Sequence, residues 1–253
     1  MLNNYNKLIN NLESLNLNMF RANIDTYLEL ISKGEKDIVD SLYELTQYEV
    51  TLKQERAITS CVRVANFPFI KTLDDFDFGF QPSVNKDELM NFRYLKFIEN
   101  KENILFIGSP GVGKTHLATS VGIEAAKSRK STYFISCNDL ILQLKRAQLE
   151  NRLETRLKFF AKYRVLIIDE VGYLTLDTES SNLFFQLIAK RYEKNLTFIT
   201  TNKPLSKWGE IFCDSVIANA ILDRLLHHSH IINIVGKSYR TKDKLESITP
   251  NKK

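Results

Sequence analysis

Cysteine is scarce in this sequence, and long apolar runs are absent. The three cysteines, Cys61, Cys137 and Cys213, are far apart and odd in number. They therefore provide neither a disulfide framework nor the ligand spacing of a zinc site, which fits a reducing compartment. No apolar stretch approaches the length of a membrane span, and the N-terminal residues are polar instead of forming a basic and then apolar leader. These absences predict a soluble cytoplasmic protein without a membrane partner.

A strong charge of one sign is also missing from the chain as a whole. With 43% apolar and 26% charged residues, the 253 residues suffice for a large domain and a smaller one, each with a buried core. Residues 1–70 hold seven Lys or Arg against nine acids, so the net charge of +5 leaves +7 for the remainder. This basic excess is compatible with a nucleic-acid partner and equally with ordinary solvated lysines.

The most informative motif is a glycine-rich loop at residues 108–115. It reads GSPGVGKT and matches the phosphate-binding pattern G-x-x-x-x-G-K-[ST] at each fixed position. A short apolar strand is expected before it, at 103–107, and a helix after it, from 116. Because the N–H groups at a helix N-terminus lack intrahelical partners, such a loop can wrap a polyphosphate. The predicted nucleotide contacts are Gly108, Ser109, Pro110, Gly111, Val112, Gly113, Lys114, Thr115 and His116.

Individual roles follow from the chemistry of the loop. Lys114 is expected to reach the β- and γ-phosphates of ATP, and the hydroxyl of Thr115 to hold Mg²⁺. His116 is expected to lie in the first helical turn near the phosphates and not to be a catalyst. The loop alone identifies a nucleotide-binding protein.

Two acids follow a second apolar strand, expected at 164–168. Asp169 and Glu170 would emerge at its C-terminal end, where ligands bind in parallel sheets. Asp169 can hold Mg²⁺ directly or through water, and Glu170 can polarise a water for attack on the γ-phosphate. Paired acids after a strand are common caps, but together with the phosphate loop they predict a catalytic pair and hence an ATPase.

Three more polar side chains are candidates for the reaction. Asn202, after an apolar strand at 196–200, could hold the attacking water or a phosphate oxygen, or be an ordinary loop asparagine. Arg224, at an aliphatic helix end, could pair with Asp223, snorkel, or act as an arginine finger on a neighbouring subunit's nucleotide. Arg240 is a second candidate for sensing the γ-phosphate. The predicted catalytic residues are Lys114, Glu170, Asn202, Arg224 and Arg240.

A histidine cluster near the C-terminus invites a metal-site hypothesis. Adjacent histidines rarely share a helix face, and neither cysteines nor carboxylates complete a ligand set around His227, His228 and His230. No metal site is expected there.

Strands and helices alternate after the loop, which predicts an α/β fold with a parallel sheet between helices. Further strands are expected at 132–136 and 231–235, and helices at 87–98, 139–149, 154–161, 181–192 and 216–226. Residues 87–245 form the predicted ATPase domain, followed by a polar basic tail at 246–253.

The N-terminal part of the chain has a different pattern. Apolar residues at three- and four-residue spacing predict a helical domain at 1–65, with three or four helices and breaks at Gly34 and Asp40-Ser41. Its apolar stripe is either a core or a partner-binding face. Residues 66–86 contain five phenylalanines and two prolines and read as a linker anchored by aromatic side chains, which could also pack near the adenine.

Together, these motifs resemble the IstB-like transposition helper ATPases, which are AAA+ proteins related to the DnaC helicase loaders. The resemblance is carried by residues 108–116, 166–174, 182–188, 201–204 and 221–230 and extends upstream through 76–78 and 81–83, so it covers nearly the whole chain. It implies an AAA+ core without a separate C-terminal helical lid. It assigns Walker A, Walker B, sensor 1, arginine-finger and sensor 2 roles to Lys114 with Thr115, Asp169 with Glu170, Asn202, Arg224 and Arg240.

The resemblance also implies partners. Subunits would form a homo-oligomer on duplex DNA with nucleotides at the interfaces, contact the DNA largely without regard to sequence, and stimulate a partner transposase. The alternative is a replicative helicase loader; a small-molecule kinase or a non-hydrolysing DNA scaffold fits the motifs less well. Six basic residues between the second and third strands could contact DNA phosphates or form a solvated face: Lys145, Arg146, Arg152, Arg156, Lys158 and Lys162.

Overall fold

The computed structural model describes residues 4–241, which fall into two compact units that divide between Ser60 and Cys61. The basic tail expected at 246–253, and the expected domain end at 245, lie outside the described residues. Within 4–241, no helix has the length and hydropathy that crossing a bilayer requires.

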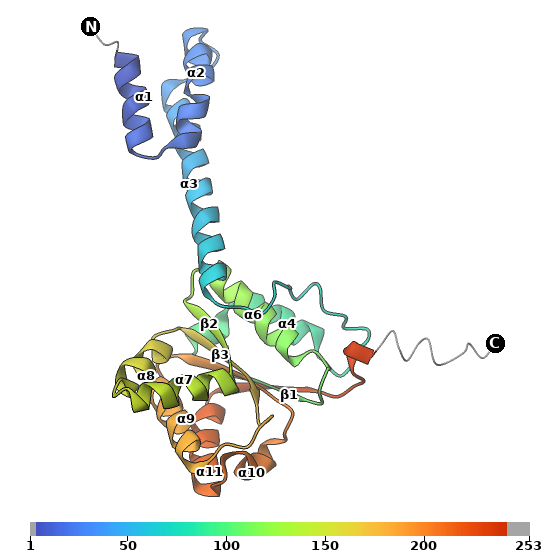
Figure 1. Cartoon of the computed structure of the whole chain (residues 1–253). Coiled ribbons are helices and arrows are strands. Elements are labelled where there is room, and N and C mark those ends of the chain that lie inside the picture. Colours follow the sequence, from blue (N-terminus) through green and yellow to red (C-terminus); the bar gives the residue numbers. More distant parts are fainter. Residues whose placement is uncertain (1–3, 242–253) are drawn as a thin grey trace, which may run out of the picture. The chain divides into compact units, whose positions relative to one another are not determined.

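The first unit is built from three helices (Figure 1): α1 (Asn4–Ser14), α2 (Asn18–Ser32) and the N-terminal part of α3 (Ile38–Val64). The expected break at Asp40-Ser41 is wrong, since Ser41 lies inside α3 and its hydroxyl donates to the carbonyl of Asp37. Glu49 of α3, although only 4% exposed, accepts hydrogen bonds from the N–H groups of Met19 and Phe20 and so caps α2. The core of the unit consists of Leu12, Phe20, Ile24, Tyr27 and Leu45.

The second unit contains a five-stranded, all-parallel sheet in the order β2-β3-β4-β1-β5. All five predicted strands are confirmed: β1 (Asn103–Gly108), β2 (Thr132–Ser136), β3 (Val165–Val171), β4 (Leu196–Thr201) and β5 (Ser229–Ile234). The order places β1, which leads into the phosphate loop, between β4 and β5. It also places β4 directly beside β3, so that the polar ends of these two strands meet.

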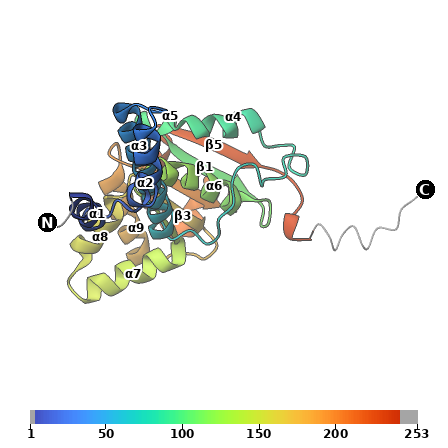
Figure 2. The same cartoon turned by 90° about the horizontal axis from the view of Figure 1, so that it is seen from above.

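Helices cover both faces of the sheet (Figures 1 and 2), as an α/β fold requires. Successive strand residues alternate between two cores: Val165 and Ile167 pack with α6 (Lys114–Lys127), whereas Leu166 and Ile168 pack on the opposite side. That opposite side is covered by α7 (Cys137–Leu149), α8 (Leu153–Ala161), α9 (Thr178–Arg191) and α11 (Ser215–Leu226). The uninterrupted apolar run of β3 therefore reflects burial on both faces.

Two helix predictions differ from the structure. The helix expected at 87–98 is divided into α4 (Lys86–Asn91), a 3₁₀ turn and α5 (Lys96–Glu99), because Leu95 adopts a left-handed conformation with φ 57°. The short α10 (Trp208–Phe212) was not predicted, since a five-residue helix is too short to show periodicity.

The aromatic segment expected as a linker, residues 66–86, packs within the second unit. It contains neither helix nor strand before Lys86. Leu73 and Phe76 are buried in the core that also contains α6. At its start, Asn66 donates to the carbonyl of Phe134 in the edge strand β2. The segment is thus held against the sheet and against the helix that follows the phosphate loop.

Candidate nucleotide-binding site

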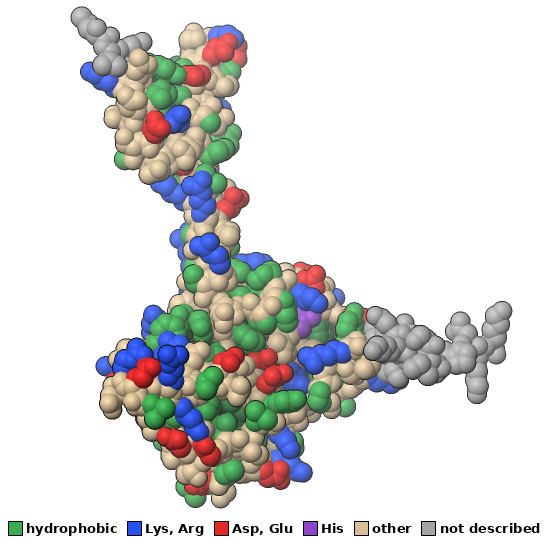
Figure 3. All heavy atoms as spheres, in the orientation of Figure 1, with side chains coloured by type: hydrophobic (Ala, Val, Ile, Leu, Met, Phe, Trp, Pro, Cys, Tyr) green, Lys and Arg blue, Asp and Glu red, His purple; other side chains and the backbone are tan. Residues whose placement is uncertain are grey.

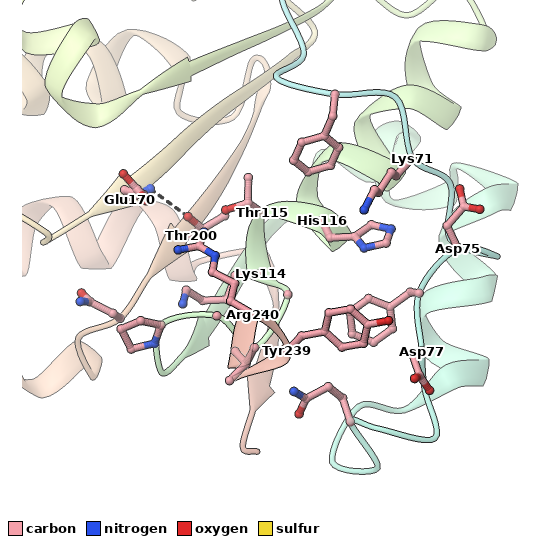
Figure 4. A pocket seen from close by; sticks show the side chains of 18 of the residues that line it. Lys71, Asp75, Asp77, Lys114, Thr115, His116, Glu170, Thr200, Tyr239 and Arg240 are labelled. Carbon is pink, nitrogen blue, oxygen red and sulfur yellow. Dashed lines mark hydrogen bonds between the residues drawn. The ribbon is translucent and has the colours of Figure 1, made fainter. Parts of the chain in front are cut away.

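A cavity of about 310 Å³ lies at the C-terminal ends of the strands (Figure 4). It lies beside the phosphate loop and is lined by residues from five separate parts of the chain. Its lining includes loop and first-turn residues Pro110, Gly111, Val112, Gly113, Lys114, Thr115 and His116, together with Glu170, Thr200, Asn202, Tyr239 and Arg240. Most of the predicted nucleotide and catalytic residues therefore share one cavity.

The loop has the conformation needed to wrap an anion. Gly113 immediately precedes α6 with φ 102°, and a Cβ there would meet the ring of Phe76 at 2.6 Å, so this position requires glycine. The Lys114 ammonium donates to the carbonyls of Gly108 and Ser109, at 2.8 Å each. Burial lowers the pKa of Lys114, and Asp169 partly opposes that effect. A bound phosphate would supply the negative charge that this half-buried ammonium lacks.

Asp169 is held by two hydroxyls from different elements. Thr115 donates to Asp169 Oδ1 at 2.9 Å, and Thr200, from the neighbouring strand β4, donates to the same oxygen at 2.5 Å. Burial raises the pKa of the Asp169 carboxyl, and these hydrogen bonds only partly oppose it. The site thus collects hard oxygen ligands around a carboxylate whose charge is poorly solvated.

Glu170 lines the cavity at a sharp turn of the backbone. Its φ is 61°, the register of β3 against β4 is irregular between Ile168 and Val171, and its N–H donates to the Thr200 hydroxyl at 2.9 Å. Asp169 and Glu170 therefore face different surroundings: one is buried and bonded, the other exposed. Asn202, just past β4, lines the same cavity, and its Oδ1 is buried without a hydrogen-bond partner among the described residues.

Arg240 reaches the cavity from the C-terminal side of the chain. It lies in the 3₁₀ turn Tyr239–Thr241, and Figure 4 shows it beside Lys114 and Thr200. Its positive charge contributes to the lowered pKa of Lys114. Two cations thus converge where the terminal phosphates of a nucleotide would lie.

Arg224 is not in this cavity. Its guanidinium donates to the carbonyl of Ala220 at 2.7 Å and lies over the ring of Phe185. It lines a small separate cavity with Asn103 and Thr197, which are at the N-terminal ends of β1 and β4. A six-residue strand spans about 20 Å, so Arg224 lies at the opposite end of the sheet from Glu170 and cannot contact a nucleotide on its own loop.

Aromatic side chains form the other wall of the cavity. The His116 ring packs edge-on against Phe76 at 5.4 Å between centroids, and its Nε2 lies 3.0 Å from the carbonyl of Thr72. Burial lowers the pKa of His116. Figure 4 shows the ring pointing toward Lys71 and Asp75, away from Glu170. His116 thus lines the cavity on the side away from the acids, next to the aromatic segment.

Several lining residues were missed by sequence reasoning. Thr200 belongs to a strand in which it looks like any buried β-branched residue, and only its pairing beside Asp169 reveals its role. Tyr239 and Gln81 also line the cavity, although the sequence assigned neither residue a role in the site. For the aromatic wall, the sequence did offer a signal, which is the high phenylalanine content of residues 66–86.

The three histidines near the C-terminus lie apart from the cavity and have other partners. His227 is 2.9 Å from the Tyr192 hydroxyl, and His230 is 3.0 Å from Glu102. Within the described range, no group of three or more His, Cys, Asp or Glu side chains is arranged to hold a metal ion.

The sequence and fold match known proteins in the regions that form this site. The pattern of the IstB-like ATP-binding proteins matches residues 10–247. The chain belongs to this family. An ATP-binding protein of insertion sequence IS232 from Bacillus thuringiensis subsp. berliner is 51% identical over 243 residues, covering 96% of this chain and 97% of the relative. One of insertion sequence IS21 from Pseudomonas aeruginosa is 41% identical, covering 92% and 88%.

Solved structures support an AAA+ core for this IstB-like protein. The DnaC helicase loader superposes with a TM-score of 0.54 at 25% identity, covering 64% of this chain and 96% of the loader. DnaA from Aquifex aeolicus, bound to the ATP analogue AMPPCP, has a TM-score of 0.57 at 17% identity, covering 74% of this chain and 58% of DnaA, and shows the shared fold.

The residues around Asp169 fit a magnesium ion. Mg²⁺ prefers carboxylate and hydroxyl oxygens and retains some of its waters. Asp169 and Thr115 present such oxygens beside the loop, and the raised pKa of Asp169 indicates a carboxylate that a cation would stabilise.

The raised pKa of Asp169 predicts that Asp169→Asn stabilises the nucleotide-free protein. Because the pKa of Asp169 is raised in the folded state, its charge costs stability above the ordinary aspartate range, and the cost disappears as the pH falls through the folded pKa. Removing the charge should raise the free energy of unfolding at pH 7 by on the order of 1 kcal/mol. Urea denaturation in EDTA would measure this difference in the free energy of unfolding. The stability gain of the variant should shrink toward pH 4. In excess Mg²⁺-ATP the variant should instead be less stable than the unmodified protein. A lower stability of the variant at pH 7 in EDTA would contradict the prediction.

Proposed function

We propose that this IstB-like protein hydrolyses ATP in an oligomer assembled on duplex DNA, and that the assembly stimulates a partner transposase. The position of Arg224 carries the proposal. It is the predicted finger, yet it lies at the opposite end of the sheet from its own phosphate loop. A nucleotide site completed by a neighbour's Arg224 makes hydrolysis depend on assembly. The relatives named for insertion sequences support a role in transposition.

Each of the cavity residues has its own role in the hydrolysis of ATP. Loop N–H groups and Lys114 bind the phosphates, and Arg240 adds a second cation beside them. Mg²⁺, held by Thr115 and Asp169, would neutralise phosphate charge. The exposed Glu170 carboxylate accepts the proton of an attacking water, and Asn202 Oδ1, which has no partner among the described residues, orients that water. A neighbour's Arg224 would stabilise charge that develops on the γ-phosphate.

The structure separates the six candidate DNA-contacting residues into two groups. Four of them form ion pairs with acids: Lys145 with Asp177 and Glu179, Arg146 and Arg152 with Glu150, and Lys158 with Glu154. Figure 3 shows acidic side chains among the basic ones gathered over α7 and α8. The charge of these four residues is therefore largely neutralised locally.

The other two, Arg156 and Lys162, form no ion pair within residues 4–241 and lie over the Phe159 ring at 4.4 and 4.8 Å from its centroid. We infer that Arg156 and Lys162 contact DNA phosphates.

A pair of double variants tests this surface. Arg156→Gln with Lys162→Gln should weaken duplex binding about tenfold and reduce the salt slope by about 1–2. Arg146→Gln with Arg152→Gln changes the net charge equally but should weaken binding less, since both residues pair with Glu150, whose single negative charge offsets one of the two. Fluorescence anisotropy over a range of salt concentrations measures both. Equal losses in the two double variants, or no loss in the first, would show that DNA lies elsewhere.

The alternative function is a helicase loader, favoured by the likeness to DnaC. Both functions require an ATPase, but they differ in the partner that the assembly engages. Electron microscopy of the full-length protein with ATP and duplex DNA is the most informative experiment. We expect nucleotide-dependent oligomers wrapped on duplex DNA, and DNA-stimulated ATP hydrolysis in parallel assays. Assembly on a ring helicase without duplex binding would support the loader instead.

A further inference from the structure

The turn that carries Arg240 has little structure of its own. After β5 ends at Ile234, residues 235–238 form neither helix nor strand, and the 3₁₀ turn Tyr239–Thr241 follows. We call residues 235–241 the C-terminal arm. Contacts with other segments help to position it.

Those contacts come from four consecutive residues of the aromatic segment, Phe80 to Ser83, which we call the strap. Gln81 Nε2 donates to the Lys237 carbonyl at 2.7 Å. The Ser83 hydroxyl accepts from the N–H of Val235 at 2.9 Å. The Phe80 ring packs edge-on against Tyr239 at 5.3 Å between centroids. The strap thus holds the arm at three successive points along its length.

Gln81 is the central contact of the three. Its side chain is only 1% exposed, although it comes from a segment without regular structure. A Cβ at Gly236 would clash with Gln81 Oε1, so the arm backbone passes as close to the amide as glycine permits. The amide must direct Nε2 at the Lys237 carbonyl, because only a donor satisfies that carbonyl. Gln81 Oε1 is buried without a hydrogen-bond partner among the described residues, so burial of this amide costs free energy that only the bond to Lys237 offsets.

The arm is joined at its other end to the phosphate loop. The Tyr239 N–H donates to the Gly111 carbonyl at 2.9 Å, immediately before Arg240. Two tied residues therefore precede Arg240 in the arm: Lys237, which contacts the strap, and Tyr239, which contacts Gly111 of the loop. Losing the Lys237 contact removes the strap hydrogen bond that lies nearest to Arg240 in the sequence.

We propose that Gln81 is a positioning residue that holds Arg240 at the terminal phosphates through its hydrogen bond to the Lys237 carbonyl. This inference rests on the proposed role of Arg240 in ATP hydrolysis. It gives the strap a function in the reaction, because a segment far from Arg240 in sequence helps to hold Arg240 in place.

Gln81→Met tests the proposal because it keeps the length and volume of the side chain but removes the donor. Gln186→Met, on the exposed side of α9, is the matched control. Ser83→Ala, which removes a second tie, guards against a folding defect specific to position 81. All variants are made in the full chain.

The first measurement reports the position of the arm without reference to catalysis. Trypsin cleavage after Lys237 is followed by mass spectrometry. We expect cleavage at least about fivefold faster in Gln81→Met than in the unmodified protein or in Gln186→Met, with a smaller increase for Ser83→Ala. An unchanged rate in Gln81→Met overturns the inference whatever the ATPase activity.

The second measurement is a double-mutant cycle with Arg240→Ala, using DNA-stimulated ATP hydrolysis. Gln81→Met should lower kcat about tenfold when Arg240 is present but less than twofold in the Arg240→Ala background. Equal factors in both backgrounds, or a rise in KM with kcat unchanged, overturn the inference. If Arg240→Ala alone leaves hydrolysis intact, its proposed catalytic role fails, while the cleavage result still decides whether Gln81 holds the arm.

Discussion

Replacing Glu170 with glutamine is expected to lower kcat for ATP hydrolysis by about 10²–10⁴, the usual contribution of a general base. The amide keeps the size of the side chain and the bond from the residue's N–H to Thr200, but it cannot accept a proton from water. Binding of ATP should be retained because the loop and Lys114 are untouched. The variant should therefore accumulate as an ATP-bound oligomer on DNA.

Single-turnover hydrolysis and electron microscopy of the same sample measure the two parts of this result. Glu210→Gln, on the exposed side of α10, is the control and should hydrolyse ATP normally. Loss of ATP binding in Glu170→Gln would contradict the assignment, as would hydrolysis within a factor of two of the unmodified protein.

Replacing Arg224 with alanine is expected to lower hydrolysis in the assembled state by about 10³–10⁵, the range for an arginine finger. ATP binding by the isolated subunit should not change, because Arg224 lies at the other end of the sheet from the cavity. Loss of its contact with Phe185 should affect α11 only locally. The defect should therefore appear only where one subunit completes the site of another.

Mixing inactive variants tests the finger in trans. An Arg224→Ala subunit retains an intact cavity, and a Glu170→Gln subunit retains an intact finger. With random assembly at equal amounts, about a quarter of the interfaces combine the two intact halves, so about a quarter of the activity should return. If the mixture stays inactive although mixed oligomers form, Arg224 does not act across the interface.

The predicted part of the site depended on short local patterns. The phosphate loop is one continuous segment whose chemistry requires glycine, lysine and a hydroxyl at fixed spacing, so its residues could be named without the fold. Asp169 and Glu170 could be named because a doubly buried strand is recognisable by its apolar run and ends at the ligand-binding edge. The strand predictions succeeded for the same reason.

The sequence by itself determined the phosphate loop, the acidic pair and the alternation that produces a parallel sheet, because each depends on neighbours in the chain. Only the tertiary structure decided what surrounds them. The strand order places Thr200 against Asp169, packing brings the strap to the arm of Arg240, and ion pairs leave Arg156 and Lys162 as the unpaired cations among the six candidates. The position of Arg224 at the far end of the sheet was also invisible in sequence, since it depends on how α11 crosses the strands. These features join residues that are far apart along the chain, and such pairs are specified by packing rather than by any local pattern.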